Sequence, residues 1–125
     1  MKWRIFLYSR DRCVVRTVAS VAGDLGCRAF GTGSLSGAIA FLRDNLHPAD
    51  ISIVDIGHYG VGFGMLDAIQ EYHVELPCIT VTESGAEYYQ ALALINGATD
   101  VFAKPLNAGE LSHAVLRIRE HGFWR

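Results

Sequence analysis

The sequence lacks the features of several protein classes. The start, residues 1–11, returns to charge too soon for a secretion signal, and no run approaches the ~18 consecutive apolar residues of a membrane span. A basic excess is also missing, because 11 Lys and Arg face 13 Asp and Glu, a net charge of -2. Nucleic-acid-binding surfaces normally show a clear basic excess. We therefore expect a cytoplasmic protein with no nucleic-acid partner and no membrane partner.

Cysteine pairs are missing as well. Cys13, Cys27 and Cys78 are odd in number, widely spaced and set among apolar residues, without a CxxC pattern. The sequence therefore predicts small buried hydrophobic side chains in a reducing compartment, and neither a disulfide nor a cysteine metal site.

The chain has the size and composition of one globular unit. It has 125 residues, of which 50% are hydrophobic and 19% charged, so a disordered chain is excluded. A chain of this length buries about two-thirds of the surface that its unfolded form exposes. We expect a single domain over residues 1–125.

Short apolar runs alternate with segments of helical periodicity along the whole chain. Several runs are apolar at consecutive positions, as in strands that are covered on both faces. Right-handed crossovers would place the intervening helices on both sides of the sheet. The sequence therefore predicts an α/β, doubly wound, five-stranded parallel sheet. The predicted strands are 5–8, 27–30, 51–54, 78–81 and 101–103.

Ligands of open parallel sheets bind at the carboxyl ends of the strands. Asp55 stands at such an end, where it could be a nucleophile, a metal ligand or the cap of the next loop. Lysine is scarce, with Lys2 and Lys104 alone among the 11 Lys and Arg residues. Lys104 after the fifth strand could pair with a carboxylate or a phosphoryl group. The other polar residues at these ends are Ser9, Arg10, Asp11, Thr82, Glu83 and Ser84.

Three segments together resemble the receiver domain of two-component response regulators. They are ADISIVDI at 49–56, LPCITVT at 76–82 and GATDVFAKPL at 97–106. Each segment is common by itself, but their order and spacing over nearly the whole chain are fairly specific. The resemblance implies a flavodoxin-like (βα)5 fold.

The resemblance also implies roles for individual residues. Asp55 matches the phosphoacceptor, Thr82 the hydroxyl that contacts the phosphoryl group, and Lys104 the lysine that pairs with it, with a cis bond to Pro105. The implied partners are a histidine kinase or phosphotransfer protein and a downstream protein. Magnesium would offset the charge of the transferred group.

The acidic pair that holds magnesium in this family is degraded here. The aligned residues are Ser9 and Arg10, and Asp11 follows one place later. A guanidinium would repel a divalent cation that needs carboxylate oxygens. Arg10 could instead pair with Asp55; alternatively it turns outward while Asp11 reaches in, so that Asp55, Asp11 and Gly57 form a weak magnesium site.

Two further positions depart from the family pattern. The small residue that normally follows Thr82 and gives the donor access is Glu83. Its carboxylate would obstruct and repel a phosphoryl group, or it could bind Arg10 or Lys104. The aromatic switch position is Val101, and Phe102 beside it has the wrong parity in a strand to replace it. These changes predict impaired magnesium binding and phosphorylation.

Glycine-rich segments support an alternative of another class. The loop 57–64 stands where the receiver family usually has a proline-containing turn. It was either remodelled to bind a partner or ligand, or changed by drift in a site that is no longer used. The segment 31–37 resembles a phosphate-binding loop. Ser34 as a helix cap explains the second segment better. The alternative function is a flavodoxin-like domain that binds a small ligand or nucleotide.

The predicted fourth helix has apolar residues on two sides. Tyr88, Leu92 and Ile95 form one stripe, Tyr89 and Ala93 another, and only one of them can pack on the sheet. Receiver domains commonly bind partners through the fourth helix, fifth strand and fifth helix, so we expect an interaction surface there, such as a homodimer contact.

The sequence thus predicts a stand-alone, atypical receiver that is not an enzyme and acts through protein contacts. Two mechanisms stay open. In one, Asp55 is still phosphorylated with help from Asp11; in the other, Arg10 locks the site and the domain is a phosphorylation-independent adaptor.

Overall fold

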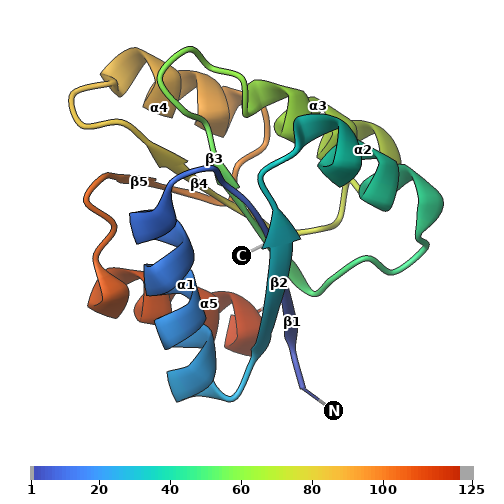
Figure 1. Cartoon of the computed structure of the whole chain (residues 1–125), viewed down its shortest axis with the longest axis vertical. Helices are drawn as coiled ribbons and strands as arrows, with labels where there is room; N and C mark the ends of the chain where they lie inside the picture. Colours follow the sequence, from blue (N-terminus) through green and yellow to red (C-terminus); the bar gives the residue numbers. More distant parts are fainter. Residues whose placement is uncertain (1, 122–125) are drawn as a thin grey trace.

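The computed structural model describes residues 2–121 and contains one five-stranded parallel sheet in the order β2-β1-β3-β4-β5 (Figure 1). This confirms the predicted doubly wound α/β fold. The strands are β1 (Arg4–Tyr8), β2 (Arg28–Thr32), β3 (Ile51–Asp55), β4 (Cys78–Thr82) and β5 (Asp100–Ala103). The helices are α1 (Arg12–Leu25), α2 (Leu35–Asp44), α3 (Phe63–Tyr72), α4 (Glu87–Ile95) and α5 (Ala108–His121).

The sheet separates two hydrophobic cores. Helices α1 and α5 cover one face, and α2, α3 and α4 cover the other (Figure 1). Side chains along β1 alternate between them, since Ile5 packs in the first core and Phe6 in the second. Strands β3 and β4 are buried at every position, which explains why apolar residues occur on both faces of each strand.

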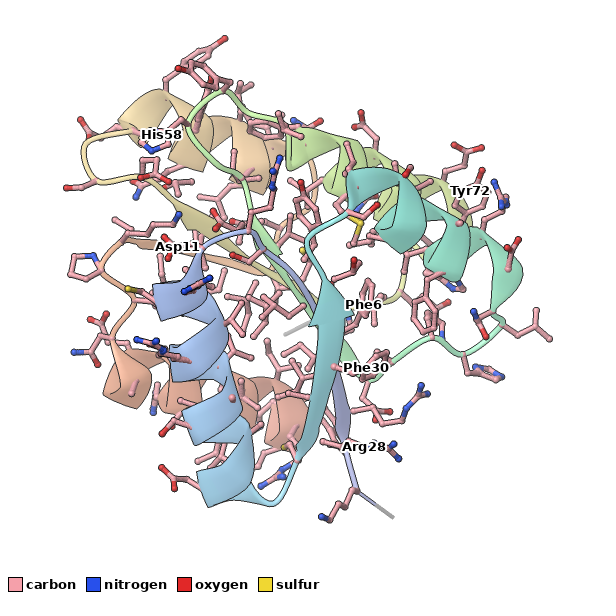
Figure 2. The ribbon with its side chains drawn as sticks, in the orientation of Figure 1. Phe6, Asp11, Arg28, Phe30, His58 and Tyr72 are labelled. Atoms are coloured by element: carbon pink, nitrogen blue, oxygen red, sulfur yellow. The ribbon has the colours of Figure 1, made fainter. Side chains whose placement is uncertain are left out.

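Aromatic side chains fill the second core near the free edge of β2. The rings of Phe6 and Phe41 stack with centroids 4.7 Å apart, and Phe30 lies 5.4 Å from Phe6 (Figure 2). The guanidinium of Arg4 lies 5.0 Å from the Phe30 ring centroid and covers it. The edge strand is therefore anchored by its side chains as well as by its pairing with β1.

Local sequence signals account for the helix ends. Ser34 caps α2, because its hydroxyl accepts a 3.1 Å hydrogen bond from the Gly37 amide, as predicted. Helix α1 ends at Gly26, whose φ of 69° is left-handed and favours glycine. The segment 31–37 therefore owes its composition to a helix cap and to the end of β2, where a Cβ on Gly31 would collide with the Leu7 backbone.

Two sequence expectations need correction. Cys27 and Cys78 are buried as predicted, but Cys13 is exposed, because it lies in the first turn of α1 on the side away from the sheet. The glycine-rich loop is also shorter than predicted. Helix α3 already begins at Phe63, because Met65 and Leu66 in its first turn are buried in the second core.

None of the helices described between residues 2 and 121 has both the length and the apolar character needed to cross a bilayer.

Candidate functional site

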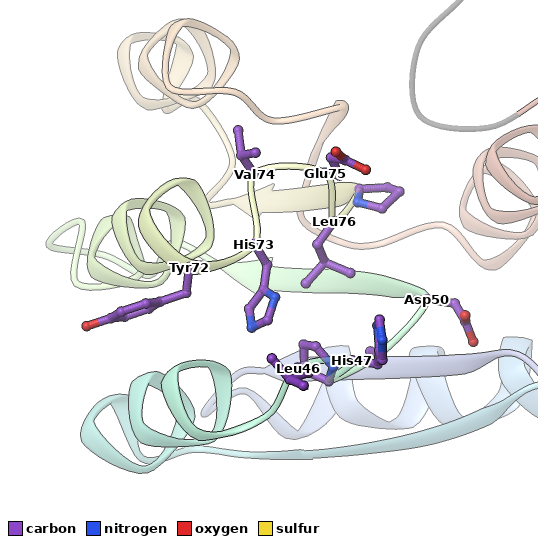
Figure 3. A pocket seen from close by; sticks show the side chains of 11 residues that line it. Leu46, His47, Asp50, Tyr72, His73, Val74, Glu75 and Leu76 are labelled. Atoms are coloured by element: carbon purple, nitrogen blue, oxygen red, sulfur yellow. The ribbon is translucent and has the colours of Figure 1, made fainter.

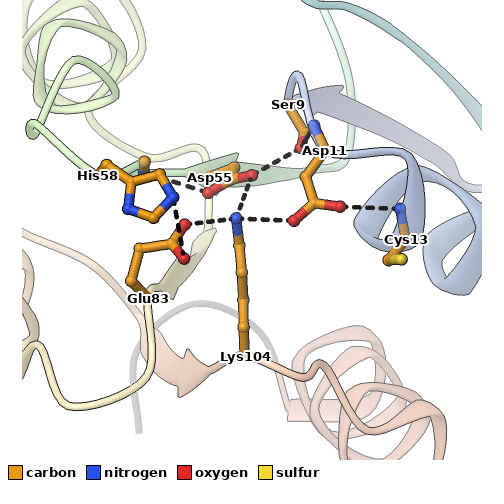
Figure 4. A network of polar contacts seen from close by, with 8 residues as sticks. Ser9, Asp11, Cys13, Asp55, His58, Glu83 and Lys104 are labelled. Carbon is orange, nitrogen blue, oxygen red and sulfur yellow. Dashed lines mark hydrogen bonds and ion pairs between the residues drawn. The ribbon is translucent and has the colours of Figure 1, made fainter.

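The carboxyl ends of β1, β3, β4 and β5 bring polar side chains to one edge of the sheet. Asp55 is the last residue of β3, and Lys104 follows β5 directly. Figure 2 shows Asp11 and His58 near this end, far from Arg28 at the start of β2. The topology thus assembles the cluster of strand-end residues that the sequence predicted (Figure 4).

Asp55 is the buried centre of the site, with 5% of its surface exposed. Its Oδ2 accepts a 2.7 Å hydrogen bond from the Ser9 hydroxyl and lies 3.1 Å from Nζ of Lys104. The Gly57 amide donates a 3.1 Å bond to Oδ1. Both carboxylate oxygens therefore have partners from this chain, which offsets the cost of burying the charge.

Lys104 joins three carboxylates in one ion cluster (Figure 4). Its Nζ lies 2.7 Å from Glu83 Oε2, 3.0 Å from Asp11 Oδ2 and 3.1 Å from Asp55 Oδ2. Burial by itself would lower the pKa of Lys104, but the hydrogen bonds to these carboxylates outweigh it and raise the pKa above its ordinary value. The ammonium is therefore firmly charged at neutral pH.

Asp11 connects this cluster to α1. Its Oδ1 caps the helix by accepting a 2.8 Å bond from the Cys13 amide, while Oδ2 faces Lys104. The hydrogen bond from Lys104 lowers the pKa of Asp11, and the bond from the Cys13 amide adds to this against the effect of burial. The sequence analysis raised the possibility that Asp11 reaches in, and the structure has that arrangement.

Arg10 does not pair with Asp55. It is exposed, and the ion pairs described for residues 2–121 place Lys104 on that carboxylate instead. Its Cγ lies against Gly33, 3.3 Å from where a Cβ on that glycine would stand. The residue before it, Ser9, is buried and bonds to Asp55. Of the two alternatives for Arg10, the structure does not have the pairing with Asp55; the exposed arginine lines the cavity above that carboxylate.

Thr82 is the last residue of β4, and Val101 lies within β5, as the sequence segments predicted. Thr82 is fully buried, and its hydroxyl accepts a 3.2 Å bond from the side-chain amide of Gln90. Val101 packs in the core under α4, whereas Phe102 packs in the core on the opposite face, as its parity in the strand predicted. Gln90 was missed by sequence reasoning, because a lone glutamine within a helix carries no motif.

A cavity of about 420 Å³ opens above Asp55. Arg10, Asp11, Glu83 and Lys104 line it, together with the loop between β3 and α3. From that loop, Tyr59 is 90% exposed and His58 Nε2 lies 3.7 Å from Glu83 Oε1. A small phosphodonor could therefore reach the region of Asp55, but it would have to pass the carboxylates of Asp11 and Glu83.

The residues around this cavity fit magnesium poorly. Ser9 supplies a hydroxyl where a carboxylate would be needed, and the Lys104 ammonium already bonds to Asp11 and Asp55. Among the residues that the structure describes, no cluster of three or more His, Cys, Asp or Glu side chains is arranged to hold a metal. The departure from the family's magnesium site thus lies in the side chains that this chain offers as metal ligands.

A second hollow, of about 460 Å³, lies at the opposite ends of the strands, between the loops that lead into β3 and β4 (Figure 3). His47 and His73 line it, with Asp50 and Tyr72 nearby. Its polar groups support the fold, since Asp50 accepts a 2.8 Å bond from the Arg4 amide and the His73 ring bonds to a backbone carbonyl of α2. We assign no site to it.

Solved structures similar to this chain are receiver domains. The receiver domain of NtrX from Brucella abortus is 25% identical with a TM-score of 0.82, covering 94% of this chain and 98% of that one. A response-regulator receiver domain protein from Clostridium thermocellum is 20% identical with a TM-score of 0.80 and covers 92% of both chains. No family model matches the sequence, and no curated protein does.

A longer NtrX structure from the same organism matches 98% of this chain at 25% identity and a TM-score of 0.84, but this chain covers only 28% of that one. The chain therefore spans little more than a quarter of that protein. The fold is that of a response-regulator receiver domain, which confirms the resemblance read from the three sequence segments. These similarities support response-regulator signalling as the general class of function; receiver domains are in general signalling modules and not enzymes.

Proposed function

We propose that this chain is an atypical receiver that acts through protein contacts, with Asp55 as the phosphoacceptor position and with impaired magnesium binding and phosphorylation. One observation carries the proposal: Lys104 Nζ lies within 3.1 Å of carboxylate oxygens of Asp11, Asp55 and Glu83 at once. The ammonium takes the cationic place between carboxylates that a metal would need.

Phosphorylation at this site would be a simple transfer. A carboxylate oxygen of Asp55 attacks the phosphorus of acetyl phosphate, a P–O bond forms, and the bond to the acetate oxygen breaks as acetate leaves. In this chain the attacking oxygens are engaged by Ser9, Gly57 and Lys104. The carboxylate of Glu83 beside them repels the incoming dianion. Both effects slow the transfer.

The partners that this proposal implies are a histidine kinase or phosphotransfer protein and a downstream protein. The outer side of α4 supports a contact with a partner or a second copy, since Tyr88 and Ile95 are 73% and 78% exposed while Ala93 is fully buried. Large apolar side chains at such exposure are typical of interaction surfaces when they lie together on one helix.

Intact-mass analysis after incubation with acetyl phosphate and magnesium tests the proposal. We expect little adduct on the native protein and at least about tenfold more on a Ser9→Asp, Glu83→Ala double variant, because a tenfold rate corresponds to only ~1.4 kcal/mol. Asp55→Asn in the double variant should abolish the adduct. Asp24→Asn is the matched control, since Asp24 is exposed near the end of α1.

Rapid, stoichiometric phosphorylation of the native protein would show that the site is not impaired. An adduct that survives Asp55→Asn would move the phosphoacceptor to another residue.

A further inference from the structure

Glu83 makes the shortest contact in the ion cluster. It follows β4 directly, and its Oε2 lies 2.7 Å from Lys104 Nζ, closer than Asp11 or Asp55. The three carboxylates come from three different segments and meet at one ammonium (Figure 4).

An ammonium has three N–H donors and no more. Here Lys104 donates a hydrogen bond to Glu83 and forms ion pairs with Asp11 and Asp55, so an added anion at the ammonium competes with these carboxylates. The competition from Glu83 is specific to the chain, because it depends on a carboxylate at position 83.

The three carboxylates differ in how firmly they are held. Asp55 is 5% exposed and is fixed by Ser9 and Gly57, and Asp11 is fixed by its cap on α1. The Glu83 side chain is 24% exposed, less than the 33% of Asp11, but its second oxygen has no anchor of this kind among the described residues and faces the exposed ring of His58 at 3.7 Å. Glu83 is therefore the carboxylate that can leave Lys104 without disturbing a second hydrogen bond.

We infer that Glu83 is a built-in, displaceable anionic ligand of Lys104, which holds the loop between β4 and α4 in place until an added phosphoryl group takes its position. This inference rests on the proposed function, because the displacing anion is the group bound to Asp55. It makes Glu83 a positioning residue that acts through Lys104.

The release of Glu83 would be passed to α4 through a short loop. The Ala86 amide donates a 3.2 Å bond to the Glu83 carbonyl, and the Gln90 amide bonds in turn to the Ala86 carbonyl at 3.1 Å. Gly85 between them has a φ of 79°, a conformation that glycine adopts without strain. Movement of Glu83 therefore changes the first turn of α4, next to the exposed Tyr88.

Backbone hydrogen exchange and NMR titration test this without any phosphodonor. Glu83→Gln keeps the side-chain shape and removes the charge, whereas Glu71→Gln is the matched control on an exposed residue of α3, outside this segment. We expect the Ala86 and Gln90 amides to exchange about tenfold faster in Glu83→Gln and at the native rate in the control. The pKa of Lys104, followed by the NMR signal of its ε-carbon, should fall in Glu83→Gln alone.

Native exchange rates and a native Lys104 pKa in Glu83→Gln would overturn the inference. Global thermal melts identify any general loss of stability, and faster exchange across the whole sheet would also count against a local effect of Glu83 on the loop.

Acetyl phosphate and magnesium are then added to each variant. Faster exchange together with a larger adduct on Glu83→Gln supports both proposals. No adduct on any variant would overturn Asp55 as phosphoacceptor and the displacement of Glu83 by a phosphoryl group. The exchange rates of the loop amides still report whether Glu83 holds the loop through Lys104.

Discussion

The hydroxyl of Ser9 donates a 2.7 Å hydrogen bond to Oδ2 of Asp55, between two residues that are both at least nine-tenths buried. The same serine oxygen accepts a 3.0 Å bond from the Asp11 amide. Ser9 thus fixes the carboxylate and the loop after β1 together, with a neutral group in a place where the receiver family carries a negative charge.

Restoring that charge is expected to restore cation binding. Ser9→Asp adds a carboxylate beside Asp55 and Asp11, and we expect magnesium affinity to rise by at least about tenfold, or ~1.4 kcal/mol. Isothermal titration calorimetry measures this, with Ser9→Ala as the control that removes the hydrogen bond without adding charge. Equal magnesium affinity in all three proteins would contradict the assignment of Ser9 as the weak point.

Removing the ammonium should destabilise the fold. Lys104→Met leaves the carboxylates of Asp11, Asp55 and Glu83 facing one another, and we expect a loss of about 2–4 kcal/mol in the free energy of unfolding. Urea unfolding measures it against Lys2→Met, a change at an exposed lysine. A native urea midpoint for Lys104→Met would show that the cluster contributes nothing.

The contribution of this cluster depends on pH at both ends of the range. The folded pKa of Asp11 is lowered from 3.8, so its contribution is present above about pH 4 and is lost as the pH falls through the folded value. The folded pKa of Lys104 is raised from 10.5, so its contribution is present below that pH and is lost as the pH rises through the folded value. The difference in urea midpoint between the native protein and Lys104→Met should therefore be largest between these limits and shrink outside them.

Two glycines should respond in opposite ways to alanine. A Cβ on Gly62 would collide with the carbonyl oxygen of Asp55, whereas a Cβ on Gly23, in α1, would meet nothing within 4 Å. We expect Gly62→Ala to lower the free energy of unfolding by about 1–3 kcal/mol. Gly23→Ala should raise it by about 0.5–1 kcal/mol, because alanine favours a helix. Thermal unfolding of both variants decides; equal effects would refute the close approach at Gly62.

The outer side of α4 should matter for association and not for folding. Tyr88→Ala with Ile95→Ser removes two exposed apolar groups, so stability should change by less than about 0.5 kcal/mol. We expect any concentration-dependent dimer to disappear in sedimentation equilibrium, while Leu46→Ser, a change at another exposed apolar residue, leaves it intact. A dimer that persists in the double variant would place its interface elsewhere.

The sequence predicted the fold well because burial on both faces leaves a clear pattern. The apolar runs marked the strands to within one or two residues, and the parallel topology brought Asp55 and Lys104 to one edge. The start of α2 was also readable, because Ser34 was recognised as its cap.

Side-chain direction beyond the strand ends could not be predicted. Arg10 and Glu83 both lie in loops, where no alternation indicates which way a side chain points. Arg10 is exposed and Glu83 bonds to Lys104, so the cation that meets Asp55 is Lys104 alone among the described residues. The contact between Gln90 and Thr82 was equally hidden, because it depends on how α4 lies across the sheet.

The ion cluster also ties together distant parts of the polypeptide. Asp11 precedes α1 and Lys104 follows β5, so the two side chains can meet only after the sheet between them has been assembled. Because such a long loop must close before the contact forms, we expect the cluster to add little to the rate of folding and mainly to slow unfolding. The residues of the candidate site would in that case also lengthen the lifetime of the finished fold.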